Sequence, residues 1–269
     1  MIPMNKYVKL FGFDFISESD ISVMAGKILN AESYEKDGLF PYLITPNVDD
    51  IVKFSKDENK ELKDTFTKSI YVLPDGQLIV WASSLTKDKM AQRLPGSDLL
   101  PHLLDESKSN HKFLALTSSE KISDSLKEKN KNVVCYTLPF FDRMNAGVID
   151  EVTTNCVKLI RENNIRIVIV GISFPKQNIL AINIHKKLKA EGIEQMPLFC
   201  MLGASFEFYL KFKKRAPVLM QKLGLEWFHR FTTDPKRLFR RYFIEDMAFF
   251  PILFREVMKR GLPIRYKKR

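Results

Sequence analysis

The sequence predicts an α/β protein in which helices layer a mostly parallel sheet, followed by a basic helical segment at the carboxyl end. Short apolar segments alternate with helical periodicity through residues 1–208, the pattern of a sheet covered by helices. The runs at 133–134 and 168–170 lack polar alternation, as parallel strands buried on both faces do. Charge separates the two parts, because residues 209–269 carry 17 Lys or Arg against 5 Asp or Glu. We therefore expect a core at 1–208 and an appendage at 209–269.

The expected elements follow from periodicity and from turn residues. An extended segment at 6–15, broken at Asp14, precedes a helix at 19–29. The amphipathic patterns at 151–163 and 178–190 predict helices. Strands of the sheet are expected at residues 41–45, 70–73, 113–116, 133–137, 165–170 and 197–201.

Three loops directly follow expected strands, at residues 45–47, 74–76 and 171–177. In open parallel sheets, ligands bind beyond the carboxyl ends of the strands, where loops and helix amino termini face a crevice. The sequence therefore places a ligand site at these loops. Neither GxGxxG nor GxxxxGK[ST] occurs in the chain, which disfavours dinucleotide oxidoreductases and P-loop enzymes.

The appendage combines basic and aromatic residues. Helices are expected at 217–230 and 235–243, followed by an uncharged, mostly apolar run at 247–254. Interleaved cations and aromatic rings suit a segment lying in a membrane interface, and they equally suit helices that pack on the core. Its polyanionic partner would be nucleic acid, an anionic membrane surface or a phosphorylated substrate. No nucleic-acid-binding signature occurs, so nucleic acid is not the expected partner.

Other protein classes are excluded by simple counts. The longest stretch without Asp, Glu, Lys or Arg is 195–206, about 12 residues, whereas a membrane-spanning helix needs roughly 18. Charged residues from Lys6 onward leave no apolar run of signal-peptide length, so export is not expected. The three cysteines are far apart, which argues against a CxxC pair and a disulfide framework and fits a reducing cytoplasm.

Seven short motifs, in order between about residues 45 and 242, resemble the WecG/TagA/CpsF family of bacterial glycosyltransferases, glycosyltransferase family 26. They are VLPDG at 72–76, RLPGSDL at 93–99, VGISFPKQ at 170–177, GASFEF at 203–208, KRAP at 214–217, LGLEW at 223–227 and PKRLFRRY at 235–242. The resemblance implies a Rossmann-like core, sometimes trimeric, with a carboxyl-terminal appendage. A homo-oligomer is therefore compatible with it.

The resemblance also implies an activity: transfer of a sugar from a UDP-sugar donor to a sugar on a polyprenyl-pyrophosphate acceptor. Such transfer contributes to capsule, exopolysaccharide, teichoic acid or common antigen assembly. The enzyme would be peripheral, at an anionic membrane surface on the cytoplasmic face. The alternative is a noncatalytic membrane-bound scaffold of a polysaccharide synthesis complex.

Asp75 matches the proposed catalytic Asp of the family. An inverting transfer needs a base that takes the proton from the acceptor hydroxyl. Asp75 follows a strand and precedes Gly76, which we assign to substrate binding. The alternative role for Asp75 is to cap a helix or hold a turn, as Pro-Asp-Gly often does.

The departing diphosphate needs positive charge. The chain has no Asp-x-Asp motif and no metal-ligand spacing of histidines, so neither a metal nor another cofactor is expected. Guanidinium groups can bind two phosphate oxygens at once. By resemblance we assign this role to Arg93, Arg230, Arg237 and Arg240. The alternatives are a surface ion pair for Arg93 and lipid headgroup binding for the others.

Donor contacts are assigned by the same resemblance to Thr45, Asn47 and Gln177, whose hydroxyl and amide groups suit uridine and sugar atoms. Turn chemistry is the alternative for Thr45 and Asn47. Gly171 and Gly203 would let the backbone approach the ligand or simply form tight turns. The sequence departs from the family at Asn178, where Glu is usual, at Ala204 in a Gly-Gly-Ser turn, and at 117–119, which replace a Gly-rich loop. These departures bear on the identity of the donor.

Overall fold

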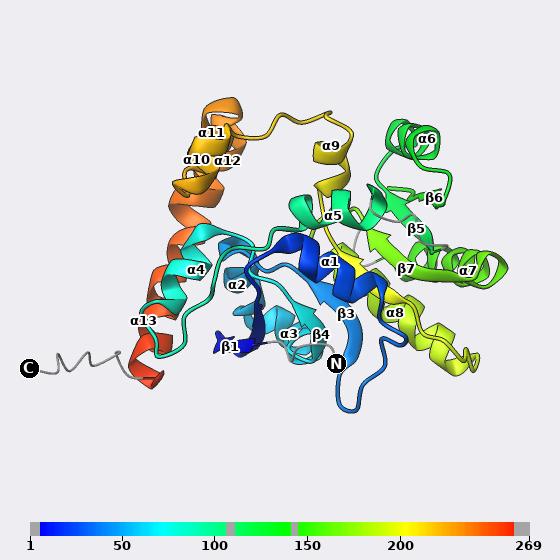
Figure 1. Cartoon of the computed structure of the whole chain (residues 1–269), viewed down its shortest axis with the longest axis horizontal. Coiled ribbons are helices and arrows are strands. Elements are labelled where there is room, and N and C mark those ends of the chain that lie inside the picture. The colour runs from blue at the N-terminus through cyan, green and yellow to red at the C-terminus, as the bar shows by residue number, and fades with distance from the viewer. Residues whose placement is uncertain (1–5, 106–110, 141–144, 261–269) are drawn as a thin grey trace, which may run out of the picture.

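A computed structural model describes residues 6–105, 111–140 and 145–260 of the chain. Its centre is a six-stranded sheet whose strand order is β4-β3-β8-β7-β5-β6, with every neighbouring pair parallel (Figure 1). This confirms the predicted α/β class. The strands are β3 (Phe40–Ile44), β4 (Ser69–Val72), β5 (Lys112–Thr117), β6 (Val133–Thr137), β7 (Ile165–Val170) and β8 (Leu198–Met201).

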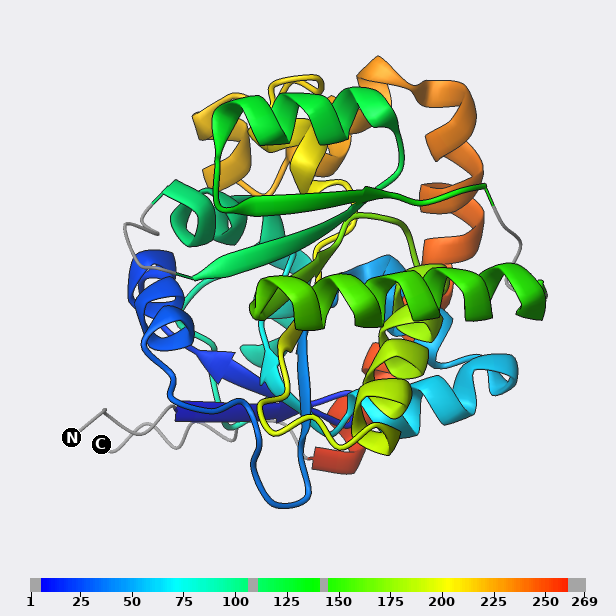
Figure 2. The same ribbon diagram turned by 90° about the vertical axis from the view of Figure 1, so that its right-hand side faces the viewer.

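Helices cover both faces of this sheet, as buried strands require. One face packs against α2 (Val48–Phe54), α3 (Lys60–Phe66), α7 (Ala146–Asn163) and α8 (Lys176–Ala190). The other face packs against α1 (Ile21–Leu29), α5 (Gly96–Asp105), α6 (Glu120–Lys129) and α9 (Ser205–Tyr209). Figure 2, turned by 90°, shows α7 and α8 lying along their face of the sheet.

Side chains alternate between the two faces along each strand. In β5, Leu114 and Leu116 join the cluster with α7 and α8, whereas Phe113 and Ala115 join the cluster with α5 and α6. All four side chains are fully buried. This two-sided burial explains why the strands appear in the sequence as apolar runs without polar alternation.

The amino-terminal segment differs from its predicted form. Residues 6–17 make an antiparallel hairpin of β1 (Lys6–Leu10) and β2 (Phe13–Ser17). The predicted break at Asp14 is wrong, because Asp14 is an exposed residue inside β2 that pairs with Lys9. The chain reverses at Phe11 and Gly12, whose φ angles of 55° and 89° lie in the left-handed region that glycine adopts without strain. Asp20 caps α1 by accepting a hydrogen bond from the Ser22 amide at 2.8 Å.

The appendage is a chain of short helices that wraps along one side of the core (Figure 1). It contains α10 (Val218–Lys222), α11 (Glu226–Thr233), α12 (Pro235–Arg240), a π-helical turn (Arg241–Glu245), a 3-10 turn (Asp246–Ala248) and α13 (Phe249–Arg260). The predicted single helix at 217–230 is wrong, because Gly224, at φ 71°, separates α10 from α11. The helix predicted at 235–243 is an α-helix as far as Arg240 and continues as the π-helical turn to Glu245, two residues beyond the predicted end. Residues 261–269 of the predicted appendage lie outside the described residues.

The appendage packs on the core and also leaves apolar side chains exposed. Phe249 and Val257 of α13 are buried, and the Phe249 ring lies 5.5 Å from the Phe11 ring between centroids. A carboxylate oxygen of Glu256 accepts a hydrogen bond from the Phe11 amide at 3.0 Å. In contrast, Phe250 and Phe254 on the same helix are more than half exposed. Among the described residues, no helix has the length and apolar character needed to cross a membrane.

Candidate active site

A cavity of about 580 Å³ lies beyond the carboxyl ends of the strands. It lies where the strand-end rule for parallel sheets predicts a ligand site. Each of the six strands contributes a residue to its wall from the loop that follows it. These residues are Thr45 after β3, Asp75 after β4, Ser118 after β5, Leu138 after β6, Gly171 after β7 and Gly203 after β8.

The rest of the wall carries charge of both signs. Cationic groups come from the core and from the appendage: Lys53, Lys176, Lys213, Arg230, Arg237 and Arg241. The acidic groups are Asp49, Asp50, Asp75 and Glu207. The cavity is therefore closed on one side by the strand ends and on another by cations of the appendage, an arrangement that suits a ligand with negative charge.

Asp75 is held by the backbone of two neighbouring segments. Its amide donates to the Pro46 carbonyl at 3.1 Å, and the carbonyl of Pro74 accepts from the Leu94 amide at 2.6 Å. Burial raises the pKa of the Asp75 carboxyl to about 6, and the nearby Arg230 limits the rise. A carboxyl with a pKa close to neutral can exchange protons in the pH range of a cell.

The alternative role of Asp75 as a helix cap is not what the structure shows. The residue at the N-cap position of α4 (Gln77–Ser83) is Gly76, with a φ angle of 117°. Gly76 has no side chain to pair with the helix amides, and it is not among the residues that line the cavity. Asp75 lies one residue earlier, in the turn before the helix, and lines the cavity.

Asn47 caps a helix and also lines the cavity. Its Oδ1 accepts from the Asp50 amide at 3.2 Å, and an Asp50 carboxylate oxygen accepts from the Asn47 amide at 3.1 Å. This reciprocal capping box begins α2 and fixes Asn47 at the cavity wall. Turn chemistry at Asn47 is therefore confirmed, and its side chain still lines the cavity. Burial and the adjacent Asp49 charge raise the pKa of Asp50 to about 7.

Two of the three glycines predicted at the site, Gly171 and Gly203, are subject to different constraints. A Cβ at Gly171 would lie 2.4 Å from the ring of Phe206, so close packing excludes any other residue there. Gly203 has a φ of 52°, and a Cβ there would meet the Ile172 carbonyl oxygen at an ordinary contact distance of 4.0 Å, so its backbone conformation is what favours glycine. Both residues line the cavity.

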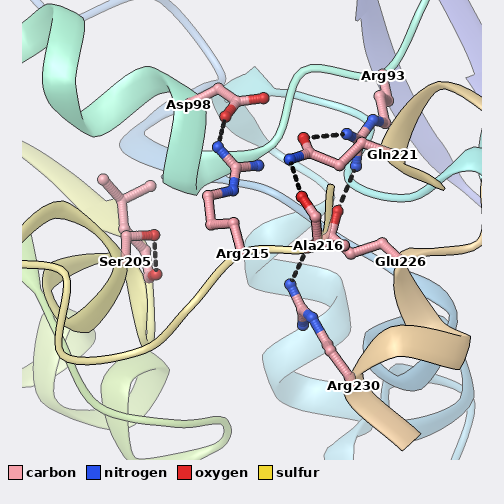
Figure 3. A network of polar contacts seen from close by, with 9 residues as sticks. Arg93, Asp98, Ser205, Arg215, Ala216, Gln221, Glu226 and Arg230 are labelled. Atoms are coloured by element: carbon pink, nitrogen blue, oxygen red, sulfur yellow. Dashed lines mark hydrogen bonds and ion pairs between the residues drawn. The ribbon is translucent and has the colours of Figure 1, made fainter. Parts of the chain in front are cut away.

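Arg93 lies outside the cavity lining and joins the core to the appendage (Figure 3). Its guanidinium contacts a carboxylate oxygen of Glu226 at 2.8 Å and Oε1 of Gln221 at 3.1 Å. Glu226 also contacts Arg230 at 2.6 Å. Burial acts to raise the pKa of Glu226, but Arg230 and Arg93 outweigh it and hold that pKa below its usual range. Arg93 thus takes part in a mostly buried ion pair rather than the surface ion pair considered for it, and it shares its partner Glu226 with Arg230. A second contact between core and appendage pairs Arg215 with Asp98.

The appendage arginines divide into two groups. Arg230 and Arg237 line the cavity as predicted. Arg240 does not line it; its side chain is 79% exposed and pairs with Glu245 at 3.1 Å. Arg241 lines the cavity instead and contacts Asp49 of α2 at 3.1 Å. Positions 240 and 241 follow position 237 by three and four residues, and both spacings share one face of a helix, so helical spacing alone does not separate the two.

Other lining residues were not predicted as site residues. Lys53 and Asp49 lie on α2, a helix absent from the expected elements, and they pair at 2.7 Å. Asn178, singled out only as a departure from the family pattern, lies in the first turn of α8 beside Gln177. Within the described residues, no three His, Cys, Asp or Glu side chains gather in a way that could hold a metal ion.

Comparison with known proteins identifies the family. The model of the glycosyl transferase WecG/TagA/CpsF family matches residues 8–262 of the chain. The chain belongs to this family. Similar proteins include N-acetylglucosaminyldiphosphoundecaprenol N-acetyl-beta-D-mannosaminyltransferases of Staphylococcus aureus strains NCTC 8325 and MRSA252. Each is 26% identical over 242 residues, which cover 87% of this chain and 87% of the relative.

Membership in the WecG/TagA/CpsF family confirms the resemblance seen in the seven motifs. The match begins in the β1–β2 hairpin and ends beyond α13, so the appendage belongs to the family pattern together with the core. The names of the relatives describe transfer of an aminosugar to a sugar carried on a diphosphate lipid.

Proposed function

We propose that this chain is an inverting glycosyltransferase that moves a sugar from a UDP-sugar to a polyprenyl-pyrophosphate-linked sugar in cell-surface polysaccharide assembly. The observation that carries the proposal is the position of Asp75. Its carboxyl, with a pKa of about 6, lies in the same cavity as the polar strand-end residues and the cations of the appendage. Both relatives are named for the transfer of an N-acetylhexosamine to a diphosphoundecaprenol-linked sugar, which supports this donor and acceptor class.

The reaction assigns a task to each group. The acceptor hydroxyl oxygen attacks the anomeric carbon, and the bond from that carbon to the diphosphate oxygen breaks. Asp75 takes the hydroxyl proton, and UDP leaves with the bonding electron pair. Arg230 and Arg237 stabilise the negative charge that develops on the diphosphate, as preorganised cations do in other transfer reactions. Arg93 acts as a positioning residue, because it holds Glu226 and thereby Arg230.

Transfer of radiolabelled N-acetylhexosamine from its UDP derivative to a short-chain polyprenyl-pyrophosphate sugar tests this function. We expect product formation in buffer containing EDTA, because we assign charge neutralisation to guanidinium groups. The alternative function, a noncatalytic scaffold, predicts no affinity for UDP, and titration calorimetry measures that directly. Absence of both transfer and UDP binding would refute the proposed activity.

The pH dependence of the reaction follows from the pKa of Asp75. A general base works only when deprotonated, so kcat/KM should fall about tenfold per pH unit as the pH drops below about 6. The value near 6 is higher than the ordinary pKa of an aspartate because burial disfavours its charged form. Initial rates between pH 4.5 and pH 8.5, with unfolding monitored in parallel by circular dichroism, measure this dependence. A rate that is constant down to pH 4.5 would contradict the role of Asp75.

We further propose that the appendage docks on an anionic membrane at the cytoplasmic face, where the lipid-linked acceptor would be presented. Exposed apolar side chains on the appendage support this proposal. They include Leu219, Leu223, Trp227, Phe228, Phe239, Phe243, Ile244, Phe250 and Phe254, each at least 41% exposed. Cations such as Arg237 and Arg240 lie among them, and both features favour an interface with acidic lipid.

The double variant F239S/F243S should bind vesicles of acidic phospholipid about tenfold or more weakly than the unmodified protein. The two rings lie 5.2 Å apart between centroids, are about half exposed, and would lose most of their apolar contact with the bilayer. Vesicle flotation measures the partition. Tyr7→Ser, which removes a similarly exposed ring from β1, serves as the control and should leave binding unchanged. Equal binding by the double variant would exclude this part of the appendage from docking.

A further inference from the structure

Two amide side chains at the start of α8 carry buried oxygens without partners. Asn178 is only 2% exposed, and its Oδ1 has no hydrogen-bond donor. The Oε1 of the adjacent Gln177 is also buried and has no hydrogen-bond donor. Both residues line the cavity. A buried acceptor without a donor is costly to a folded protein, so its persistence calls for a specific explanation.

The backbone of this helix end is already satisfied. The Gln177 amide donates to the Ser173 carbonyl at 3.3 Å, and the Asn178 amide donates to the Pro175 carbonyl at 3.0 Å. The backbone amides of Gln177 and Asn178 therefore have acceptors, whereas the side-chain oxygens of the same two residues have no donor. A diphosphate offers acceptor oxygens and cannot supply a donor near neutral pH. An uncharged group that bears O–H or N–H can.

Other elements supply the cations of the appendage that line the cavity. Arg230, Arg237 and Arg241 line the cavity from α11, α12 and the π-helical turn. The Lys176 ammonium, at the start of α8, lies over the Phe140 ring at 4.9 Å from its centroid. The wall of the cavity thus carries both guanidinium groups and unpaired amide oxygens, which suits a ligand with an anionic part and a neutral, hydroxyl-rich part.

We propose that Asn178 is a specificity-determining residue whose Oδ1 accepts a hydrogen bond from an O–H or N–H group in the uncharged part of the nucleotide sugar. The nucleoside or the sugar then lies at the start of α8, and the diphosphate lies at the guanidinium groups. This inference rests on the proposed function for the identity of the ligand. It explains why an acceptor stays unpaired in the ligand-free protein: the donor that completes it arrives with the substrate.

Replacing Asn178 with leucine separates this role from a structural one. Leucine has the same branched shape at Cγ, with two methyl groups in place of the amide, and no acceptor, so the ligand-free variant should melt at the same temperature as the unmodified protein or higher. Its Kd for a UDP-N-acetylhexosamine should rise about tenfold or more, because the ligand group would lose its acceptor. Differential scanning calorimetry and isothermal titration calorimetry measure the two quantities. If the Kd for UDP alone rises equally, the contact is to the nucleoside; if only the Kd for the nucleotide sugar rises, the contact is to the sugar.

Asn183→Leu is the matched control on the same helix. The Nδ2 of Asn183 donates to the Ile179 carbonyl at 2.8 Å, and the residue does not line this cavity, so both Kd values should stay unchanged. Asn178→Ala removes the same acceptor and introduces a smaller side chain, and it should raise the Kd as the leucine variant does. If the leucine variant fails to fold, the alanine variant tests the inference. The inference is overturned if both Asn178 variants bind both ligands like the unmodified protein. Failure of the unmodified protein to bind any UDP-sugar would instead refute the proposed function.

Discussion

Replacing Asp75 with asparagine should lower kcat for sugar transfer by about 10²- to 10⁴-fold, the usual contribution of a general base. Asparagine has nearly the same shape and can still fill the wall of the cavity, but it cannot take the acceptor proton. The Kd for the UDP-sugar should change by no more than a few-fold, because Asp75 acts on the acceptor rather than on the donor. Single-turnover kinetics and titration calorimetry separate these two effects.

Asp246→Asn is the informative control for this variant. Burial also raises the pKa of Asp246 to about 6, yet this residue does not line the cavity. If the base must lie in the cavity, a raised pKa elsewhere is not sufficient. The fall in rate below about pH 6 should then persist in the Asp246 variant. Asp75→Asn should remove that fall from its residual activity. A kcat in Asp75→Asn equal to that of the unmodified protein would show that Asp75 is not the base. Loss of the pH dependence in the Asp246 variant alone would show the same.

The sheet could be predicted from the sequence because its strands are buried on both faces and appear as short apolar runs. The sequence predicts an extended segment at 6–15 but not its pairing as a hairpin, because Asp14 indicates a break. An exposed position in a strand tolerates such a charge. Helices α2, α3 and α4 are seven residues long, too short for a clear periodic signal. Their positions depend on capping and packing, as the Asn47–Asp50 capping box illustrates.

The site was predictable to the extent that it follows from strand ends. Asp75, Gly171 and Gly203 each follow a strand, and parallel topology brings such positions together. Contacts between the core and the appendage could not be inferred in this way. Arg93 and Glu226 are 133 residues apart in sequence, and nothing local in either segment indicates that they pair. The same holds for Arg241, whose contact with Asp49 depends on how the appendage folds over α2.

Replacing Arg230 with glutamine should lower kcat/KM by about 10²- to 10³-fold, as loss of a preorganised charge-stabilising group does elsewhere. A second effect should accompany this loss. Arg230 lowers the pKa of Asp75 by favouring its charged form, so its removal should move the fall in rate to higher pH. A pH profile of kcat/KM for the variant measures both effects. A lipid-headgroup role alone would reduce vesicle binding and leave kcat/KM unchanged at pH values where Asp75 is deprotonated in both proteins.

Arg240→Gln provides the matched comparison, because the two arginines were predicted together and the structure separates them. The Arg240 side chain is 79% exposed and pairs with Glu245, whereas Arg230 lines the cavity beside Glu226. We expect kcat/KM of the Arg240 variant to stay within about threefold of the unmodified protein, since exposed ion pairs contribute little. Equal losses in both variants, with no change in the pH profile, would mean that the appendage arginines act through the membrane rather than on the diphosphate. A loss confined to Arg230, together with the shift in pH dependence, would place that guanidinium at the reacting groups.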